Sequence, residues 1–341
     1  MANVPAFLDG YEAEYERDPR AATLSWFEDA KYGLFLHYGL YSLLGDGEWV
    51  QYHDRIPPAE YAQLRDYFTA EGFDAEAVVE LAADAGMEYV NLTTRHHDSF
   101  CLFDSAETGF TSVEAPCGRD LVAELADACR EEGLGLFCYY SHGRDWRHPH
   151  APNNDAWAEG SARPEYDQRP KLYAGEGHDL QRYLDFVSAQ VEELCTEYGP
   201  LAGVWFDGWS LPNVDPDAFD LPDLYTTVRD RQPQALVSYK NGLTGTEDFL
   251  APERGWLPLE SDPGKPVEVC APMNGAWGYD GTDGRTSAEE VWDLLGEVRG
   301  EGANLLLNTA PLPDGSIGPR DAATLREVGD RLRAEGFPQR S

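Results

Sequence analysis

Short apolar runs alternate with longer helical patterns along this 341-residue chain, and that alternation restricts the fold more than any other feature. Each run is almost continuously hydrophobic, which is typical of a parallel strand covered by helices on both faces. Repeated over about 300 residues, such units favour an α/β fold of the (β/α)8 TIM-barrel type, with a doubly wound sheet as the alternative. We predict strands at 32–36, 89–93, 135–140, 204–206, 235–238 and 304–308.

Helical patterns lie between these runs, and capping residues mark their ends. Asp74 opens the first pattern, Gly133 stops the second, and Ser287 with Glu290 has the spacing of a capping box. A distorted barrel is expected, because the stretch 241–285 is rich in Gly and Pro and has weak helical periodicity. We predict helices at 74–85, 120–132, 179–198, 287–300 and 321–336.

The predicted domain organisation is a single catalytic barrel over residues 1–341, with its core at about 24–336. The polar segment at about 147–177 reads as a loop-like insertion over the active face. Because the chain stops just after the last predicted helix, we expect no appended C-terminal domain.

The charge balance is strongly acidic, with 26 basic and 62 acidic residues and a formal net charge of −36. Nucleic-acid binding is not expected, since phosphate contacts need clustered Lys and Arg. The acidic residues are spread over the whole chain, which gives a highly soluble surface. It also suits a salt-rich cytoplasm, where self-repulsion is screened within about 3 Å at 1 M salt.

The sequence carries no signal for a membrane or for secretion. No run of about 18 apolar residues occurs, so no membrane span is predicted, and the acidic segment 1–20 lacks the apolar core of a signal peptide. The six cysteines form no C-x-x-C pair, which indicates free thiols in a reducing compartment. We expect a cytoplasmic protein from a high-salt organism.

Polar residues gather at one kind of position, the ends of the apolar runs. His37 follows the first run, His96 and His97 follow the second, and Asp207 follows the fourth. The third run ends in Tyr139-Tyr140-Ser141-His142. Because the carboxyl ends of barrel strands converge on one mouth, these residues predict a shared catalytic pocket.

A carbohydrate site explains these residues better than a metal site. His96 and His97 are adjacent, and neighbouring side chains on an extended segment point to opposite sides, so both rarely bind one ion. We therefore predict no metal and no cofactor. In the loop after the first strand, Glu48 and Trp49 combine a hydrogen-bond acceptor with an aromatic platform, a pairing that suits a sugar.

Asp207 is the candidate nucleophile. An ionised carboxylate is costly to desolvate at the end of a buried strand, and Trp205 and Trp209 flank it like the walls of a sugar site. A retaining glycosidase needs a second carboxyl group about 5–5.5 Å away. Spacing alone leaves three candidates for it: Glu253, Glu268 and, more weakly, Glu260.

An ordered set of motifs resembles the α-L-fucosidases of glycoside hydrolase family 29. It spans residues 26–335, and the set is far more specific than any single motif. The matching segments are Trp26-Phe27, Ala30–Gly39, Glu48-Trp49, Thr93–Phe100, Tyr139–Ser141, Val204–Gly208, Glu247–Phe249, Pro252-Glu253, Glu268, Trp277–Tyr279 and Gly302–Asn308.

This resemblance implies a distorted (β/α)8 barrel that hydrolyses terminal α-L-fucosides with retention, by double displacement through a covalent glycosyl-enzyme. Asp207 matches the nucleophile, Glu253 the acid/base of some members, and Glu268 an acid proposed for that role in others. The residues that match the lining of the fucose pocket are His37, Glu48, Trp49, His96, His97, Tyr139 or Tyr140, and Trp205.

The sequence departs from the family pattern in several places. Some members place an Arg in the loop before the acid/base, where Lys240 and Asn241 stand here. Tyr38 and Ser99 replace the usual Trp and Gly. We expect the usual C-terminal β-sandwich of the family to be absent here.

The expected partner is a fucosylated oligosaccharide or a small α-L-fucoside, and a homo-oligomer is compatible with the sequence. Two alternatives stay open. One is a hydrolase of a related α-L-glycoside such as an α-L-galactoside, because an apolar wall rejects an added hydroxyl only weakly. The other is a catalytically silent sugar-binding barrel.

Overall fold

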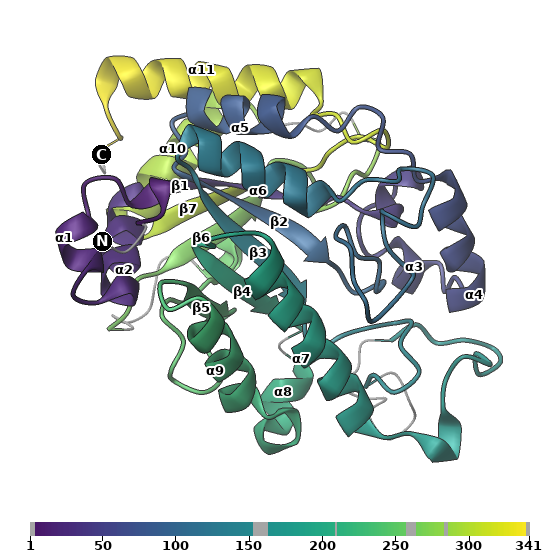
Figure 1. Cartoon of the computed structure of the whole chain (residues 1–341). Helices are drawn as coiled ribbons and strands as arrows, with labels where there is room; N and C mark the ends of the chain where they lie inside the picture. The colour runs from purple at the N-terminus through teal and green to yellow at the C-terminus, as the bar shows by residue number, and fades with distance from the viewer. Residues whose placement is uncertain (1–3, 153–162, 209, 257–263, 283–285, 339–341) are drawn as a thin grey trace.

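Seven parallel strands form one curled sheet with the order β5-β4-β3-β2-β1-β7-β6 (Figure 1). The computed structural model describes residues 4–152, 163–208, 210–256, 264–282 and 286–338. All six predicted strands are confirmed, and β6 is a strand that the sequence reasoning missed. The bounds are β1 Tyr32–Leu36, β2 Tyr89–Arg95, β3 Gly135–Ser141, β4 Gly203–Asp207, β5 Leu236–Tyr239, β6 Glu268–Pro272 and β7 Asn304–Thr309.

An irregular extended segment, residues 248–253, fills the gap between β5 and β6. On one side, the Asp248 amide donates to Val237 O at 2.8 Å and the Ala251 amide to Lys240 O at 2.7 Å. On the other side, the amides of Glu268 and Cys270 donate to carbonyls of the same segment at 2.8 and 3.0 Å. The segment takes the place of an eighth strand, which confirms the predicted distorted (β/α)8 barrel.

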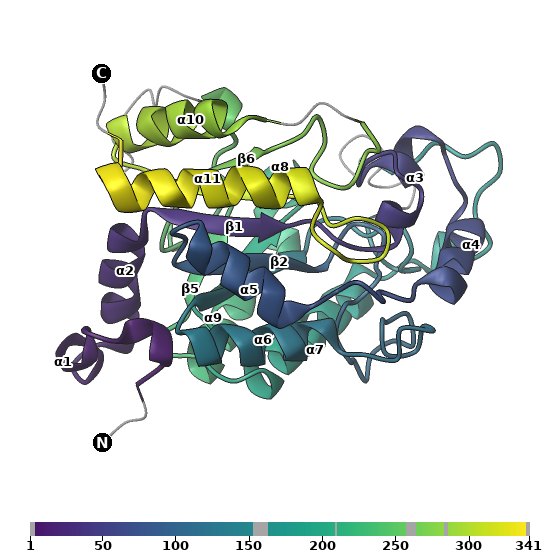
Figure 2. The ribbon, with the colours of Figure 1, turned by 90° about the horizontal axis from the view of Figure 1, so that it is seen from above.

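Long helices cover the outside of the curled sheet, except α2, which packs at the amino ends of the strands (Figure 2). As predicted, Asp74 accepts a hydrogen bond from a backbone amide at the start of α5, and Ser287 forms a capping box with Glu290 at the start of α10. Asp120 and Asp179 accept amide hydrogen bonds at the starts of α6 and α7 in the same way. Helix α9 and the N-terminal helix α2 were not predicted. The bounds are α2 Pro19–Ala30, α5 Ala75–Asp84, α6 Leu121–Glu132, α7 Leu180–Glu197, α9 Leu221–Arg231, α10 Ala288–Gly300 and α11 Pro319–Glu335.

Of the shorter helices, α1 precedes the first strand, and the others lie in loops that follow strands. The bounds are α1 Glu12–Tyr15, α3 Val50–His53, α4 Pro58–Tyr61 and α8 Ser210–Val214. Of the predicted insertion 147–177, residues 153–162 lie outside the described residues, and the described remainder contains the 3-10 helix Gly175–Gly177. Among the described residues, none of the helices is long and apolar enough to cross a membrane.

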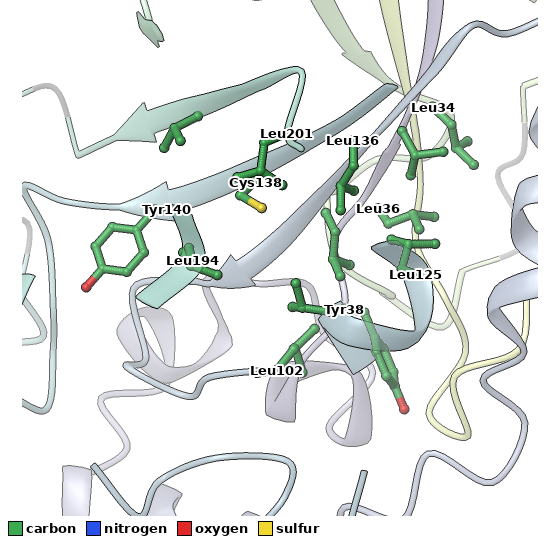
Figure 3. Close-up of a cluster of buried hydrophobic side chains, with 14 of the residues drawn as sticks. Leu34, Leu36, Tyr38, Leu102, Leu125, Leu136, Cys138, Tyr140, Leu194 and Leu201 are labelled. Atoms are coloured by element: carbon green, nitrogen blue, oxygen red, sulfur yellow. The ribbon is translucent and has the colours of Figure 1, made fainter. Parts of the chain in front are cut away.

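Alternation along the strands divides the apolar residues into two cores. Leu34, Leu136 and Cys138 point outward into the layer between sheet and helices (Figure 3). Tyr140 belongs to this outer core as well. The neighbouring Tyr139 points inward and belongs to a separate cluster inside the barrel.

Aromatic side chains fill the barrel at the amino ends of the strands. Trp26 and Phe27 of α2 belong to the inner cluster, and the Phe27 ring lies 5.8 Å from that of Phe137. At Gly33 and Gly135 an added Cβ would overlap the rings of Tyr89 and Trp26, so the interior is closed there. Any site inside the barrel must therefore open at the carboxyl ends of the strands.

Candidate active site

A cavity of about 290 Å³ opens at the carboxyl ends of the strands. It gathers side chains from strands β1 to β6 or the loops at their carboxyl ends, and from the segment 248–253. Ten of the predicted site residues line it: His37, Glu48, Trp49, His96, His97, Tyr139, Trp205, Asp207, Lys240 and Glu253. The predicted convergence of strand ends on one pocket is therefore present in the structure.

Asp207 ends β4 and points into the cavity, with its side chain 14% exposed. The Tyr139 hydroxyl donates to its Oδ2 at 2.7 Å. Burial alone would raise the pKa of this carboxyl, but Lys240, the Tyr139 hydroxyl and Arg144 together hold it below its ordinary value. Asp207 is thus kept ionised at neutral pH, as a nucleophile must be.

Lys240 lies between two carboxylates at the mouth of the barrel. Its Nζ is 3.9 Å from Asp207 Oδ1 and 3.0 Å from Glu253 Oε1, and it lies 5.1 Å from the centre of the Trp205 ring. Burial would lower the pKa of this ammonium group, yet Asp207 and Glu253 hold it above its ordinary value. Lys240 has a φ of 45°, in the left-handed region that few residues other than glycine adopt.

Glu253 is the last residue of the segment that closes the barrel, and its side chain is 51% exposed. Asp207 and Glu253 both lie near the Lys240 ammonium group. Their nearest carboxylate oxygens are therefore separated by no more than the sum of the two distances from Lys240 Nζ. The two carboxyl groups therefore lie close together at the same cavity. Glu260 and Trp209, also singled out in the sequence, lie outside the described residues.

Two predicted residues are not brought into the cavity. Glu268 begins β6 and is 1% exposed inside the barrel, where Tyr89 and Trp205 donate to its two oxygens. Tyr140 faces the helices, where its hydroxyl donates to Gln190 of α7 at 2.8 Å. Alternation along β3 separates Tyr139 from Tyr140, and depth in the barrel separates Glu268 from the cavity.

His96 and His97 both line the cavity, which contradicts the expectation that adjacent histidines point to opposite sides. The strand shifts register between Thr93 and Arg95 and ends there, so the two histidines lie on a turn. Their ring centres are 4.1 Å apart. Even so, no group of three or more His, Cys, Asp or Glu among the described residues could hold a metal ion.

Hydrogen bonds assign the proton positions of two histidines. Asn308 Nδ2 donates to Trp277 O at 2.8 Å, so its Oδ1 accepts from His37 Nδ1 at 2.6 Å. Ser141 Oγ donates to Arg144 O, so it accepts from His97 Nδ1 at 2.6 Å. Burial lowers the pKa of His37 to about 3 and lowers that of His97 as well, so both rings are neutral.

In each of these rings Nε2 is therefore unprotonated, and its lone pair is available. An unprotonated Nε2 accepts a hydrogen bond, and a sugar hydroxyl can donate one. Glu48 offers a further acceptor, because only its Oε2 is taken up by the amides of Trp277 and Gly278, at 3.0 and 2.8 Å. The cavity thus presents several acceptors to a ligand rich in hydroxyl groups.

A family model described as alpha-L-fucosidase matches residues 3–337 of the chain. The chain belongs to the α-L-fucosidase family. It is a glycoside hydrolase by this membership. The tissue alpha-L-fucosidase of Mus musculus is 30% identical, covering 92% of this chain and 70% of its own length. The human tissue alpha-L-fucosidase is 28% identical, covering 92% and 68%.

Solved α-L-fucosidases have the same fold. Isoenzyme 1 from Paenibacillus thiaminolyticus gives a TM-score of 0.81 at 34% identity, covering 93% of this chain and 77% of that chain. An AlfC variant in complex with Fuca(1,6)GlcNAc gives 0.81 at 29% identity, covering 92% and 98%. Unliganded AlfC, from Lactobacillus casei, gives 0.80 at 28% identity.

Several cavity residues of this family member were missed in the sequence. Arg144 and Trp277 line the cavity, and the guanidinium of Arg144 lies 4.9 Å from the centre of the Trp49 ring. Asn308 was quoted within a motif but was given no role. Its place as the last but one residue of β7 is the signal that could have found it, since strand ends supply the other site residues.

Proposed function

We propose that this α-L-fucosidase family member hydrolyses terminal α-L-fucosides with retention of configuration. The observation that carries the proposal is the pair of carboxylates, Asp207 and Glu253, on either side of Lys240 in one cavity. A retaining enzyme needs two carboxyl groups about 5–5.5 Å apart. The comparisons support the substrate, since AlfC was solved with a fucosyl ligand.

Asp207 attacks the anomeric carbon and forms a covalent glycosyl-enzyme. Glu253 protonates the leaving oxygen and then removes a proton from the incoming water. Its half-exposed side chain gives it access to protons from solvent, in keeping with that second step. Lys240 and Tyr139 hold Asp207 in its ionised form, as attack on the anomeric carbon requires.

The walls of the cavity suit a 6-deoxy sugar. Phe35, Trp205 and Trp277 provide apolar surface for the C5 methyl group, while His37, His97 and Glu48 accept hydrogen bonds from hydroxyl groups. The fucosylated oligosaccharide or small fucoside predicted from the sequence is therefore the proposed substrate. An α-L-galactoside, which carries one more hydroxyl at C6, would be hydrolysed more slowly.

The test is hydrolysis of aryl α-L-fucosides and α-L-galactosides in buffered KCl, followed by NMR. We expect the fucoside to be preferred and the α anomer of L-fucose to form first, as retention requires. Asp207→Ala should lower kcat by about three orders of magnitude or more. A first-formed β anomer would refute retention, and binding of fucose without turnover would identify a silent sugar-binding barrel.

The proton donor is tested separately by adding azide. Azide attacks the anomeric carbon of the glycosyl-enzyme and releases Asp207 without needing a general base, so it should restore turnover of an aryl fucoside by Glu253→Ala with fucosyl azide as the product. Glu253→Gln serves as the isosteric control. Activity of Glu253→Ala close to that of the wild-type enzyme would overturn the assignment of Glu253.

We also propose that the enzyme works in a salt-rich, reducing cytoplasm. Support comes from the net charge of −36 and from six cysteines that are all unpaired. Dense like charge destabilises a compact chain unless salt screens it. The measurement is the melting temperature of the protein in dilute buffer and in molar KCl.

A further inference from the structure

Glu268 is a buried acid that the proposed mechanism does not use. It lies at the start of β6, two residues before Cys270, and Cys270 already lines the cavity. The side chain is 1% exposed and is surrounded by the aromatic cluster inside the barrel. An acid in such a place is costly to keep, so its hydrogen bonds must compensate.

Both carboxyl oxygens of Glu268 are engaged. The Tyr89 hydroxyl of β2 donates to Oε2 at 2.6 Å, and the Trp205 indole Nε1–H of β4 donates to Oε1 at 3.0 Å. Trp205 is 1% exposed, so water cannot satisfy its N–H group. Without Glu268 the indole would be a buried donor with no acceptor, a costly arrangement that would move the ring.

Trp205 in turn contacts the groups that hold the nucleophile. Its ring stacks on that of Tyr139, with centres 5.5 Å apart and planes at 26°. Lys240 Nζ lies 5.1 Å from its ring centre. Tyr139 donates to Asp207 Oδ2 and Lys240 Nζ lies near Oδ1, while His97 Nε2 lies 3.9 Å from Oδ2.

We propose that Glu268 is a positioning residue, whose carboxyl group fixes the Trp205 indole and thereby places Tyr139 and Lys240 against Asp207. This inference rests on the proposed function, because it assigns a role in the same reaction. It differs from the role of proton donor considered for Glu268 in the sequence, since the indole lies between this acid and the cavity.

The protonation state of Glu268 gives the proposal a spectroscopic readout. Burial raises the pKa of Glu268 to about 7, whereas its bonds to Tyr89 and Trp205 act in the opposite direction. The titratable groups against it are Tyr89 of β2 and Cys270 of its own strand, and burial raises the pKa of both. Glu268 should therefore be the group that changes its charge near neutral pH beside the Trp205 indole.

The experiment compares Glu268→Gln, which keeps an acceptor for the indole, with Glu268→Leu, which removes it at similar volume. We expect Glu268→Gln to retain kcat within about threefold, and Glu268→Leu to lose about tenfold to a hundredfold in kcat on an aryl α-L-fucoside, without rescue by azide. In the Trp205→Phe background the indole N–H group is already missing. There, Glu268→Leu should lower kcat by less than about a further threefold, because the interaction it would remove is already gone. Equal losses in both backgrounds would overturn the proposal.

NMR of the Trp205 indole N–H, assigned by its loss in Trp205→Phe, provides the second measurement. The wild-type resonance should titrate with a midpoint near 7 and should not titrate in Glu268→Gln. If Glu268→Leu does not fold, a wild-type resonance that is insensitive to pH would refute the proposal. Rescue of a Glu268 variant by azide would instead make Glu268 the proton donor. An inactive wild-type protein would refute the proposed function. In that case the NMR titration would still test whether Glu268 fixes the Trp205 indole.

Discussion

Replacing Lys240 by methionine tests whether its charge keeps the nucleophile ionised. The ammonium group lies 3.9 Å from Asp207 Oδ1, and the two side chains are only 19% and 14% exposed. At this separation, and with an effective dielectric constant of about 20, two unit charges attract by about 4 kcal/mol. Since each 1.4 kcal/mol is about a factor of ten, the ratio of ionised to protonated Asp207 falls at most about a thousandfold at a given pH.

The observed change should be smaller, because Tyr139 and Arg144 continue to favour the ionised form. The pKa of Asp207 lies below its ordinary value with Lys240 present and rises without it. The acid limb of kcat/KM therefore moves to higher pH, with a loss of about threefold to tenfold near pH 5 that shrinks as the pH rises.

The assay is the pH profile of kcat/KM on an aryl α-L-fucoside for the wild-type enzyme, Lys240→Met and Lys240→Arg. Lys240→Arg keeps the charge and serves as the matched control, so its acid limb should stay close to that of the wild-type enzyme. A uniform loss in Lys240→Met at every pH, with the acid limb in its original place, would refute the electrostatic argument and leave Lys240 a purely steric role.

Three further predictions concern the hydroxyl on the nucleophile, the histidine tautomer and the acidic surface. Tyr139→Phe removes the donor to Asp207 and should lower kcat/KM about threefold to tenfold at acid pH. Tyr140→Phe, the matched control, should leave the pH profile unchanged and lower only the melting temperature. Enzyme kinetics and calorimetry of the two variants check both outcomes. Asn308→Leu removes the acceptor that sets the His37 tautomer and should weaken binding of L-fucose about tenfold by titration calorimetry, and unaltered affinity would contradict that role. With a net charge of −36, the melting temperature should rise between dilute buffer and molar KCl, and equal values in the two would contradict adaptation to high salt.

Most of the architecture could be predicted from the sequence because parallel strands are almost continuously apolar and helices have a different period. The runs that were missed are those with weaker signals. Strand β6 lies in a stretch rich in Gly and Pro, and the segment 248–253 closes the barrel with an irregular set of hydrogen bonds. No local pattern distinguishes such a segment from a loop, because its partners come from both neighbouring strands.

The choice between neighbouring residues lay beyond the sequence for a physical reason. Strands covered on both faces show no polar and apolar alternation, so nothing local tells Tyr139, which faces the cavity, from Tyr140, which faces α7. His96 and His97 share one pocket only because β2 ends at Arg95 and the chain turns. Lys240, which lies near two carboxylates, has a left-handed backbone conformation that no residue pattern predicts.

The sequence by itself determined the kind of chemistry: a carboxylate at the end of a buried strand, in company with histidines and aromatics at other strand ends, and an acidic surface. These follow from residue types and from the convergence of parallel strands at one mouth. Only the tertiary structure showed that Glu253, and not Glu268, lies at the cavity with Asp207. The two acids have the same intrinsic chemistry, but Glu253 lies at the cavity beside Lys240, whereas Glu268 lies deeper in the barrel and accepts hydrogen bonds from Tyr89 and Trp205.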